Sequence, residues 1–423
     1  MGAAAEQTIE DLLRTEAPQV LGALVRRFSR FDIAEDAVQE ALLVASRRWP
    51  VEGIPVGPRS WLIRVAYRRM IDMVRSEQSA RRREEEAGLA DPAVLDPSAP
   101  EPGVMDQDDS LLLLLLCCHP TLSPTSQVAL TLRAVGGLTT GEIAHAYGSA
   151  ESSMGTRISR AKQRLKESGA RFVPPDPAEL PARLEAVMQV LYLIFNEGYT
   201  ATAGRRLERV ELTEEAIRIT RMLSSARPDD AEVAGLLALM LLAQSRRTAR
   251  TGDEAELILL EDQDRSAWDQ ELIAEGVTLI ESAWKQREVG PYQLQAAIAA
   301  VHAQAPTADE TDWPQIAGLY LWLERLTPTS PISLSRVVAV SKAYGAQRGL
   351  ALLDDLERTY RFSENPLTRQ RELSVRAHLL ESVGDRPGAQ AAYRAAAELT
   401  ENEAEQRYLQ GRAAAIQPDE PAR

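Results

Sequence analysis

Arginine side chains alternate with aromatic ones between residues 59 and 69, and this combination suits a surface that binds nucleic acid. The segment R-S-W-L-I-R-V-A-Y-R-R places four arginines around one Trp and one Tyr. A guanidinium neutralises a phosphate, and an aromatic ring stacks on an unpaired base. The candidate residues are Arg59, Arg64, Arg68, Arg69, Trp61 and Tyr67. A cationic amphipathic helix that is only solvated is the alternative interpretation.

A second basic segment follows a sequence typical of a helix-turn-helix. L-T-T-G-E-I-A-H-A-Y predicts a short helix that Thr139 or Thr140 caps, with Glu142 in its first turn. The next helix is expected to begin near Glu151, and residues 151–173 carry six Arg or Lys against two Asp or Glu. Such a second helix enters the major groove of DNA. The candidate contacts are Ser152, Ser153, Thr156, Arg157, Arg160, Lys162 and Arg164. A helical hairpin with a basic rim is the alternative.

A third pattern is a helix over residues 32–49 with two unlike faces. The apolar face consists of Ile33, Ala37, Ala41 and Val44. The polar face consists of Glu35, Asp36, Gln39 and Glu40. An acidic face of this kind suits a basic partner helix, but a solvated charged face has the same pattern.

Patterns of catalysis or metal binding are not found in the sequence. Cys117 and Cys118 are adjacent and are the only cysteines, which excludes a disulfide framework and a thiol-zinc site. In the C-terminal half, several polar residues in apolar surroundings lack the spacing of metal ligands: Glu197, Tyr199, Asp262, Asp264, Asp269 and His302. We expect them to cap helices and to form hydrogen bonds between helices. The sequence predicts no catalytic residue, no metal site and no cofactor, and thus a protein that is not an enzyme.

The elements that position these residues are helices throughout. Apolar residues recur every three or four positions in 8–28, 33–48, 60–76, 182–195 and 212–223, and no stretch sustains a period of two. The fold class is therefore predicted as all-α. In the helix that begins near Ser60, we expect Trp61, Val65, Ile71 and Val74 to pack inward.

Pro-rich stretches divide the 423 residues into parts. Residues 87–106 are rich in Pro and acid and too poor in large apolar residues to build a core, and four prolines between 174 and 181 interrupt any helix that joins the halves. The predicted domains are 1–86, 107–172 and 174–423, with 87–106 as a flexible linker. Residues 1–173 carry 21 Arg or Lys and 23 Asp or Glu, whereas residues 174–423 carry 27 and 39. Only the N-terminal part is therefore suited to DNA.

The sequence also bears on location. The longest Leu run covers residues 111–116, far short of the roughly 20 apolar residues that a membrane-spanning helix needs. The first residues, M-G-A-A-A-E-Q-T-I-E-D-L-L, lack the basic flank and apolar core of a secretory signal. We expect a cytoplasmic protein that does not contact a membrane.

Taken together and in this order, three motifs resemble the extracytoplasmic-function (ECF) sigma factors of bacteria. They are D-x-A-E-D-A-V-Q-E-A, P-R-S-W-L-I-R-V-A-Y-R-R-M-I-D and L-T-T-G-E-I-A-H-A-Y-G-S-A-E-S-S-M-G-T-R-I-S-R-A-K, and the resemblance covers about residues 8–170. It implies a sigma domain 2 helical bundle in residues 1–86 and a sigma domain 4 helix-turn-helix in residues 107–172. Arg68-Arg69 stands where many members of the family carry Asn-Arg or Asn-Thr.

The resemblance also implies partners and a role for each residue. The residues implied to bind core RNA polymerase, at its β′ clamp helices, are Asp32, Glu35, Asp36, Gln39 and Glu40. Those implied to bind the unpaired −10 strand of promoter DNA are Arg59, Ser60, Trp61, Arg64, Tyr67, Arg68 and Arg69. The helix-turn-helix residues given above are implied to bind the −35 element, and this domain is implied to contact the polymerase β flap.

Beyond residue 170, where ordinary members of the family end, the chain resembles the subgroup with a tetratricopeptide-like (TPR-like) domain. The segments are L-Y-L-I-F-N-E-G-Y-T-A, L-L-E-D-Q-D-R-S-A-W-D and P-Y-Q-L-Q-A-A-I-A-A-V-H-A. Independently, a helical hairpin of this repeat matches the spacing of Leu373, Ala377, Leu380, Gly384, Ala389, Tyr393 and Ala396. We expect an α-helical solenoid that regulates the factor in cis through intramolecular contact with the sigma domains.

The sequence therefore predicts a factor that binds core RNA polymerase and directs promoter-specific transcription initiation. The alternative is a stand-alone helix-turn-helix transcription regulator with a repeat-protein sensor domain, which would not bind the polymerase tightly. A helical hydrolase with a DNA-binding appendage is a third hypothesis, for which the sequence supplies no nucleophile or metal ligand.

Overall fold

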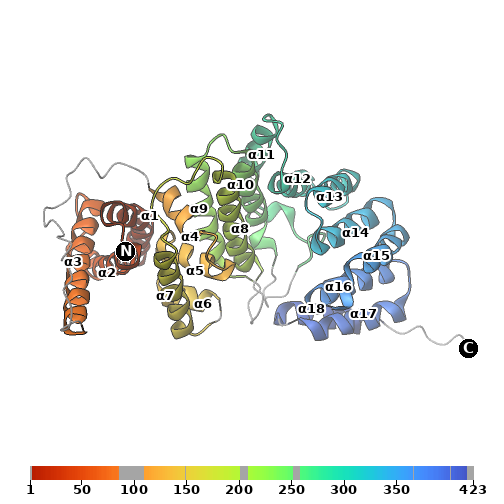
Figure 1. Ribbon diagram of the computed structural model, residues 1–423. Coiled ribbons are helices and arrows are strands. Elements are labelled where there is room, and N and C mark those ends of the chain that lie inside the picture. Colours follow the sequence, from red (N-terminus) through yellow and green to blue (C-terminus); the bar gives the residue numbers. More distant parts are fainter. Residues whose placement is uncertain are drawn as a thin grey trace, which may run out of the picture. The chain divides into compact units, whose positions relative to one another are not determined.

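A computed structural model describes residues 2–84, 109–147, 149–200, 208–250, 258–364, 366–400 and 402–416 (Figure 1). These residues form helices and turns and contain no β-strand, which confirms the all-α prediction. The predicted linker, 87–106, lies outside them. Contacts divide the chain into two compact units, residues 1–193 (unit 1) and 194–423 (unit 2), and the boundary falls inside helix α8 (Leu180–Tyr199).

Unit 1 begins with a bundle of three helices, the first bundle: α1 (Gly2–Phe28), α2 (Phe31–Glu52) and α3 (Pro58–Glu84). Alanines dominate the inward face of α2, and their small side chains allow α1 and α3 to approach closely. The buried residues of that face are Ala34, Ala37, Val38, Ala41, Leu42 and Ala45. Ile33 and Val44, expected on the apolar face, are half-buried at its edges.

The inward face of α3 differs from the predicted one. Val74 is buried as expected, but Trp61, Val65 and Ile71 are only half-buried. The core positions are instead Leu62, Ile63, Ala66, Tyr67 and Met70. Because the apolar stripe of α3 is wider than one face, the predicted positions include residues at the edge of this stripe, which pack inward only in part.

The second bundle of unit 1 consists of α4 (Ser110–Cys117), α5 (Pro124–Ala134), α6 (Thr140–Ala146) and α7 (Glu151–Glu167). A capping box begins α6: the Glu142 N–H donates to Thr139 Oγ1 at 3.1 Å, and the Thr139 N–H donates to Glu142 Oε2 at 2.6 Å. This confirms the predicted helix start, with Thr139 as the cap. The helix-turn-helix α6–α7 is therefore present. The first part of α8 joins this bundle, where Arg183 donates to the Leu115 carbonyl.

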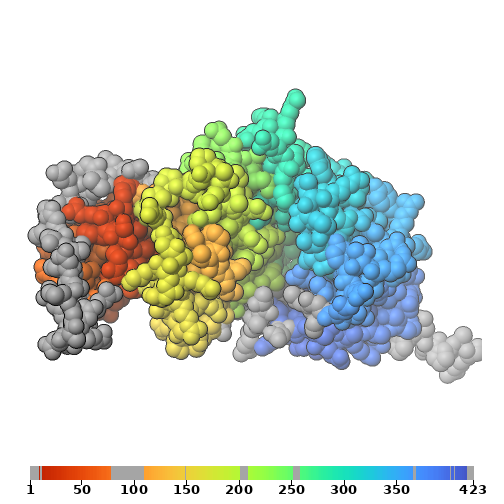
Figure 2. All heavy atoms as spheres, viewed as in Figure 1, coloured from red at the N-terminus to blue at the C-terminus, as the bar shows by residue number. Residues whose placement is uncertain are grey.

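The two bundles of unit 1 contact each other. Helix α1 packs on α4 and α5, and α2 packs on α7. On the face seen in Figure 2, the red to orange atoms of the first bundle abut the orange to yellow atoms of the second. Helices distant in sequence therefore meet across an interface inside unit 1.

Unit 2 is a series of helices, each packed mainly on the next helix or on the next but one along the chain. This quasi-one-dimensional order is typical of repeat proteins. Following the end of α8, the helices are α9 (Val210–Ala226), α10 (Ala231–Gln244), η2 (Arg247–Ala249), η3 (Arg265–Ala267), α11 (Gln270–Trp284), α12 (Pro291–Gln304), α13 (Trp313–Leu326), α14 (Ser330–Tyr344), α15 (Ala346–Tyr360), η4 (Phe362–Glu364), α16 (Pro366–Ser382), α17 (Arg386–Leu399) and α18 (Glu403–Ala415).

The hairpin predicted near the end of the chain is formed by α16 and α17. Gly384 lies in the turn between them with a φ of +87°, a conformation that side chains disfavour. Tyr393 is buried in the core of the hairpin among Ala377, Ala389 and Ala396. The small residues let the two helices approach, and the Tyr ring fills the space that remains.

Candidate functional site

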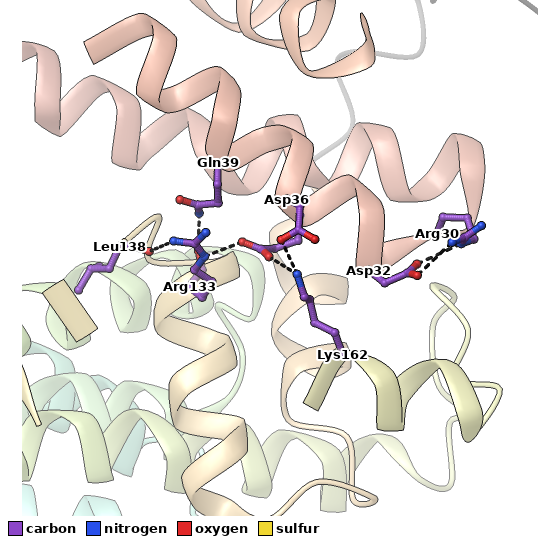
Figure 3. Close-up of polar contacts among 8 residues, drawn as sticks. Arg30, Asp32, Asp36, Gln39, Arg133, Leu138 and Lys162 are labelled. Atoms are coloured by element: carbon purple, nitrogen blue, oxygen red, sulfur yellow. Dashed lines mark hydrogen bonds and ion pairs between the residues drawn. The ribbon is translucent and has the colours of Figure 1, made fainter. Parts of the chain in front are cut away.

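The acidic residues predicted on α2 lie at the interface of the two bundles. One Glu35 oxygen accepts from Arg133 Nε of α5 at 2.7 Å, and the other accepts from Lys162 Nζ of α7 at 2.9 Å (Figure 3). Lys162 Nζ also lies 2.6 Å from Asp36 Oδ1. Lys166 Nζ lies 3.1 Å from Asp32 Oδ2. We call this set of six residues, Asp32, Glu35, Asp36, Arg133, Lys162 and Lys166, the interbundle ion cluster.

Glu35 is the centre of the cluster and is only 1 % exposed. A carboxylate excluded from water is stable only when it is paired and hydrogen-bonded. Burial by itself would raise the pKa of Glu35, but the charges and hydrogen bonds of Lys162 and Arg133 outweigh burial and hold the pKa below its usual value. The sequence placed Glu35 on a solvated or partner-binding face, and the structure places it inside the protein.

The pKa values of the other two acids of the cluster shift in opposite directions. Burial tends to raise the pKa of Asp32, but hydrogen bonds from Arg30 and Lys166 lower it to about 2. Burial raises the pKa of Asp36, and the negative charge of Glu35 adds to this rise. Lys162 thus stabilises two carboxylates that repel each other, and this part of the cluster depends on the positive charge of Lys162.

Two further residues of the predicted polymerase-binding set also have partners in unit 1. The Gln39 side-chain amide donates to the Arg133 carbonyl at 3.1 Å, which places Gln39 at the same interface (Figure 3). Glu40 is turned toward α3, where its Oε2 lies 3.3 Å from Arg69 Nε. The structure therefore brings four of the five predicted residues against the second bundle.

The residues predicted to bind a single strand lie at the beginning of α3 and on different sides of this helix. Arg64 and Arg68 are exposed and one helical turn apart. Arg59 lies 2.6 Å from Glu16, and Ser60 and Trp61 are half-buried. Tyr67 is buried in the core with its ring 5.6 Å from that of Phe28, so its ring is not available for stacking in this arrangement.

Sequence analysis missed three exposed apolar side chains between α2 and α3. Val51, Ile54 and Val56 are exposed at the end of α2 and in the loop that follows. An exposed apolar patch commonly marks a binding surface. The loop is rich in Gly and Pro, and this composition does not indicate that its apolar residues take part in binding.

The predicted contacts to duplex DNA lie on α7, and six of the seven share its exposed surface. These six are Ser152, Ser153, Thr156, Arg157, Arg160 and Arg164. Lys162 departs from the prediction because it is buried against α2 on another side of the helix. Beside the exposed surface, α7 and the beginning of α5 enclose a cavity of about 330 Å³, lined by Arg157, Arg160 and Arg164 and by Ser123, Thr125 and Ser126. These three hydroxyl groups, which the sequence analysis missed, suit a phosphate.

Four of the polar residues considered for an acid/base or metal site in the C-terminal half have structural roles in unit 2. Asp264 caps η3 and Asp269 caps α11 through their side-chain oxygens, as expected. Glu197 lies 3.0 Å from Arg209, and Arg250 lies 3.5 Å above the Tyr199 ring. The described residues contain no group of His, Cys, Asp or Glu that could hold a metal ion.

Comparison with known proteins assigns the two bundles. Residues 12–80 match the model of Sigma-70 region 2, and residues 112–165 match that of Sigma-70 region 4. Over 163 residues, or 37 % of this chain and 50 % of its relative, the chain is 33 % identical to the ECF RNA polymerase sigma factor SigJ of Mycobacterium tuberculosis. The two bundles are thus similar to Sigma-70 regions 2 and 4, and across these regions the chain is similar to an ECF sigma factor. Sigma factors are transcription initiation factors and not enzymes, which confirms the prediction that the protein is not an enzyme.

A second relative extends the similarity beyond the sigma regions. The chain is 42 % identical over 353 residues to an uncharacterized protein of Rhizobium meliloti, covering 82 % of the chain and 83 % of the relative. Residues 183–284 match a family of unknown function (DUF6596), and the match to a TPR-like subgroup is not confirmed. No solved structure matches the chain. None of the described helices is both long and apolar enough to cross a membrane.

Proposed function

We propose that this chain is an ECF-type sigma factor that binds core RNA polymerase through the acidic face of α2. It would direct the polymerase to promoters whose −10 and −35 elements its two bundles recognise. The observation that carries the proposal is the presence of both sigma regions in one chain, each with a cationic surface exposed. A stand-alone helix-turn-helix regulator has no use for region 2. Because the polymerase is cytoplasmic, we place the factor in the cytoplasm.

For the −10 element, we propose that Arg64 and Arg68 neutralise phosphates of the melted strand. Trp61 and the apolar residues Ile54 and Val56 lie near the beginning of α3, where unpaired bases would find apolar partners. Tyr67 is left out of this proposal because it is a core residue of the first bundle.

For the −35 element, we propose that the exposed surface of α7 enters the major groove. Arg157 lies near the N-terminal end of the helix, where base edges are within reach. Arg160 and Arg164 continue the exposed surface, and their cavity with Ser123 and Thr125 suits a backbone phosphate.

The test is transcription in vitro with purified core polymerase, the full chain and a library of promoters, followed by mapping of start sites. Specific start sites that depend on the chain are expected. A pull-down of core polymerase adds Glu40→Lys, expected to weaken binding, and Glu185→Lys, an exposed acid outside both proposed surfaces, as the matched control. Sequence-specific DNA binding without any association with the polymerase would favour the stand-alone regulator instead.

We further propose that unit 2 is a TPR-like domain that regulates the factor in cis. Its stack of helices and the acidic excess of residues 174–423 support a scaffold for a basic partner. Unit 2 also holds a cavity of about 680 Å³, a size usual for ligand sites, lined by Trp313, Tyr320, Tyr393, Tyr408 and His302 among others.

A truncation tests this regulatory role. The shortened chain should end after residue 200, because α8 supplies Arg183 to the second bundle and a break at Pro174 would remove that contact. If unit 2 regulates the factor, the truncated and full chains differ in polymerase affinity or in transcript yield. Equal values for both would contradict the regulatory role and leave the initiation function intact.

A further inference from the structure

The interbundle ion cluster covers the face of α2 to which we assign polymerase binding. We propose that the second bundle competes with core RNA polymerase for this face, so that the arrangement described here is a closed state of the factor. The inference rests on the proposed function. It adds a regulatory step, the separation of the two bundles, that precedes polymerase binding and does not require unit 2.

The first argument is coverage. With 1 % of its surface exposed and each oxygen bonded to a cation, Glu35 cannot contact a second protein. Gln39 donates its amide to the Arg133 carbonyl, and Asp32 is engaged by Lys166. A partner that needs these side chains can reach them only after α5 and α7 have moved away.

The second argument is that the cluster specifies this arrangement. Two cations from different helices of the second bundle converge on one buried carboxylate, and each would lose its partner if the bundles shifted. In a separate part of the interface, the second bundle also packs closely on α1. A Cβ atom added at Gly137 would lie 3.2 Å from the Ala17 Cβ atom of α1, and Arg14 lies 3.5 Å from Glu142.

The third argument is that this interface can open. The cluster surrounds a cavity of about 320 Å³ with largely polar walls, among them Asp32, Asp36 and Lys162. Charged groups at such a cavity regain water when the helices separate, which offsets the loss of their ion pairs. The bundles are joined by residues 85–108. Extended, 24 residues span up to about 80 Å, so the connection does not limit separation.

The closed state affects the proposed −35 DNA-binding surface of α7 and the proposed polymerase-binding face of α2 differently. Arg157, Arg160 and Arg164 are exposed in the closed state, whereas Glu35, at the centre of the acidic face of α2, is buried. The closed factor is therefore prevented from binding the polymerase and not from binding DNA.

The experiment reverses charge on the second bundle, so that the α2 face itself stays intact. Lys162→Glu places a third acid beside Glu35 and Asp36, and Arg171→Glu is the matched control, an exposed residue after α7 with the same charge change. Spin labels at Arg48→Cys on α2 and Glu167→Cys on α7 report the separation of the bundles in the full chain. The native Cys117 and Cys118 are buried with raised thiol pKa values, so they do not take up label readily.

Lys162→Glu is expected to lengthen the distance between the labels and to raise the affinity for core polymerase at least about tenfold, because the apparent Kd equals the intrinsic Kd divided by the open fraction. Lys166→Glu, at a more exposed pair, should act in the same direction more weakly, which guards against misfolding of the first variant. Thermal melting verifies folding. Arg171→Glu should change neither quantity.

Two results would overturn the inference. Unchanged label distances in both Lys variants would show that the cluster does not hold the bundles together. Longer distances with unchanged polymerase affinity would show that closure does not compete with the polymerase. If the label distances lengthen but neither the natural chain nor any variant binds polymerase, the proposed function itself fails, and the distance measurement tells this case apart from the others.

Discussion

Two tryptophans in the first bundle lie in contact and are predicted to respond differently to truncation. Trp49 of α2 is 3 % exposed, whereas Trp61 of α3 is half-buried, and their rings meet edge to face with centroids 5.6 Å apart. Trp49→Ala removes a full core side chain, which costs about 3–5 kcal/mol of unfolding free energy. Trp61→Ala loses the ring contact, worth about 0.5–1.5 kcal/mol, and part of its apolar burial, so we expect about 1–2 kcal/mol.

For binding of the −10 strand, we expect the reverse order: the substitution of Trp61 should have a larger effect than that of Trp49. A base stacked on an aromatic ring contributes about 1–3 kcal/mol, so Trp61→Ala should weaken binding to a single strand of the −10 element roughly 5- to 150-fold. Trp61→Phe retains a ring and should recover part of this loss. Trp49→Phe is the matched core control. The indole nitrogen of Trp49 has no hydrogen-bond partner among the described residues, so little polar interaction is lost.

Urea denaturation followed by circular dichroism gives the unfolding free energies, and fluorescence anisotropy with a labelled oligonucleotide and the polymerase complex gives the affinities. The reasoning is refuted if Trp61→Ala destabilises the protein as much as Trp49→Ala does. It is also refuted if Trp61→Ala leaves strand binding unchanged, because Trp61 would then be only a packing residue.

Further predictions concern acid stability, the bundle interface and DNA. Burial, aided by neighbouring arginines, lowers the pKa of His302 from 6.5 to about 4, so stability is full above pH 6.5 and falls by about 2 kcal/mol at pH 5; in thermal melts, His302→Gln should flatten this dependence. Gly137→Ala and Gly169→Ala both place a side chain at positive φ, but only the first crowds α1; Gly137→Ala should therefore cost more in urea denaturation, and equal costs would argue against a tight interface. Arg157→Ala with Arg160→Ala should weaken −35 binding by about 1–3 kcal/mol for each base contact and leave the melting temperature unchanged, as measured by gel shift and calorimetry.

Local signals in the sequence were sufficient for the helices and for the start of α6, although they left the cap open between Thr139 and Thr140. A capping box depends on residues three positions apart, and the apolar period of a helix depends on neighbours within two turns. Local signals did not decide the inward side of α3. Trp61 and Leu62 are adjacent apolar residues, and only packing against α2 decides which one is buried.

The interbundle ion cluster could not be predicted in this way. Glu35 and Lys162 are 127 positions apart, and each fitted a solvated face as well as a partner-binding one. Composition shows that a helix is charged, but only the tertiary structure shows which of its charges are paired with another helix. The burial of Glu35 is therefore the finding that sequence analysis was least able to supply.

Helix α7 shows how one run of basic residues serves two surfaces. Arg157, Arg160 and Arg164 are three or four positions apart and share the exposed side, whereas Lys162 and Lys166, four positions apart, point to α2. A charge reversal at Lys162 should therefore change the separation of the bundles and leave −35 binding nearly intact. A charge reversal at Arg160 should weaken −35 binding and leave the separation of the bundles unchanged. Because both residues lie on one helix and carry the same charge, the two variants have the same net charge, and the pair of measurements separates the two roles.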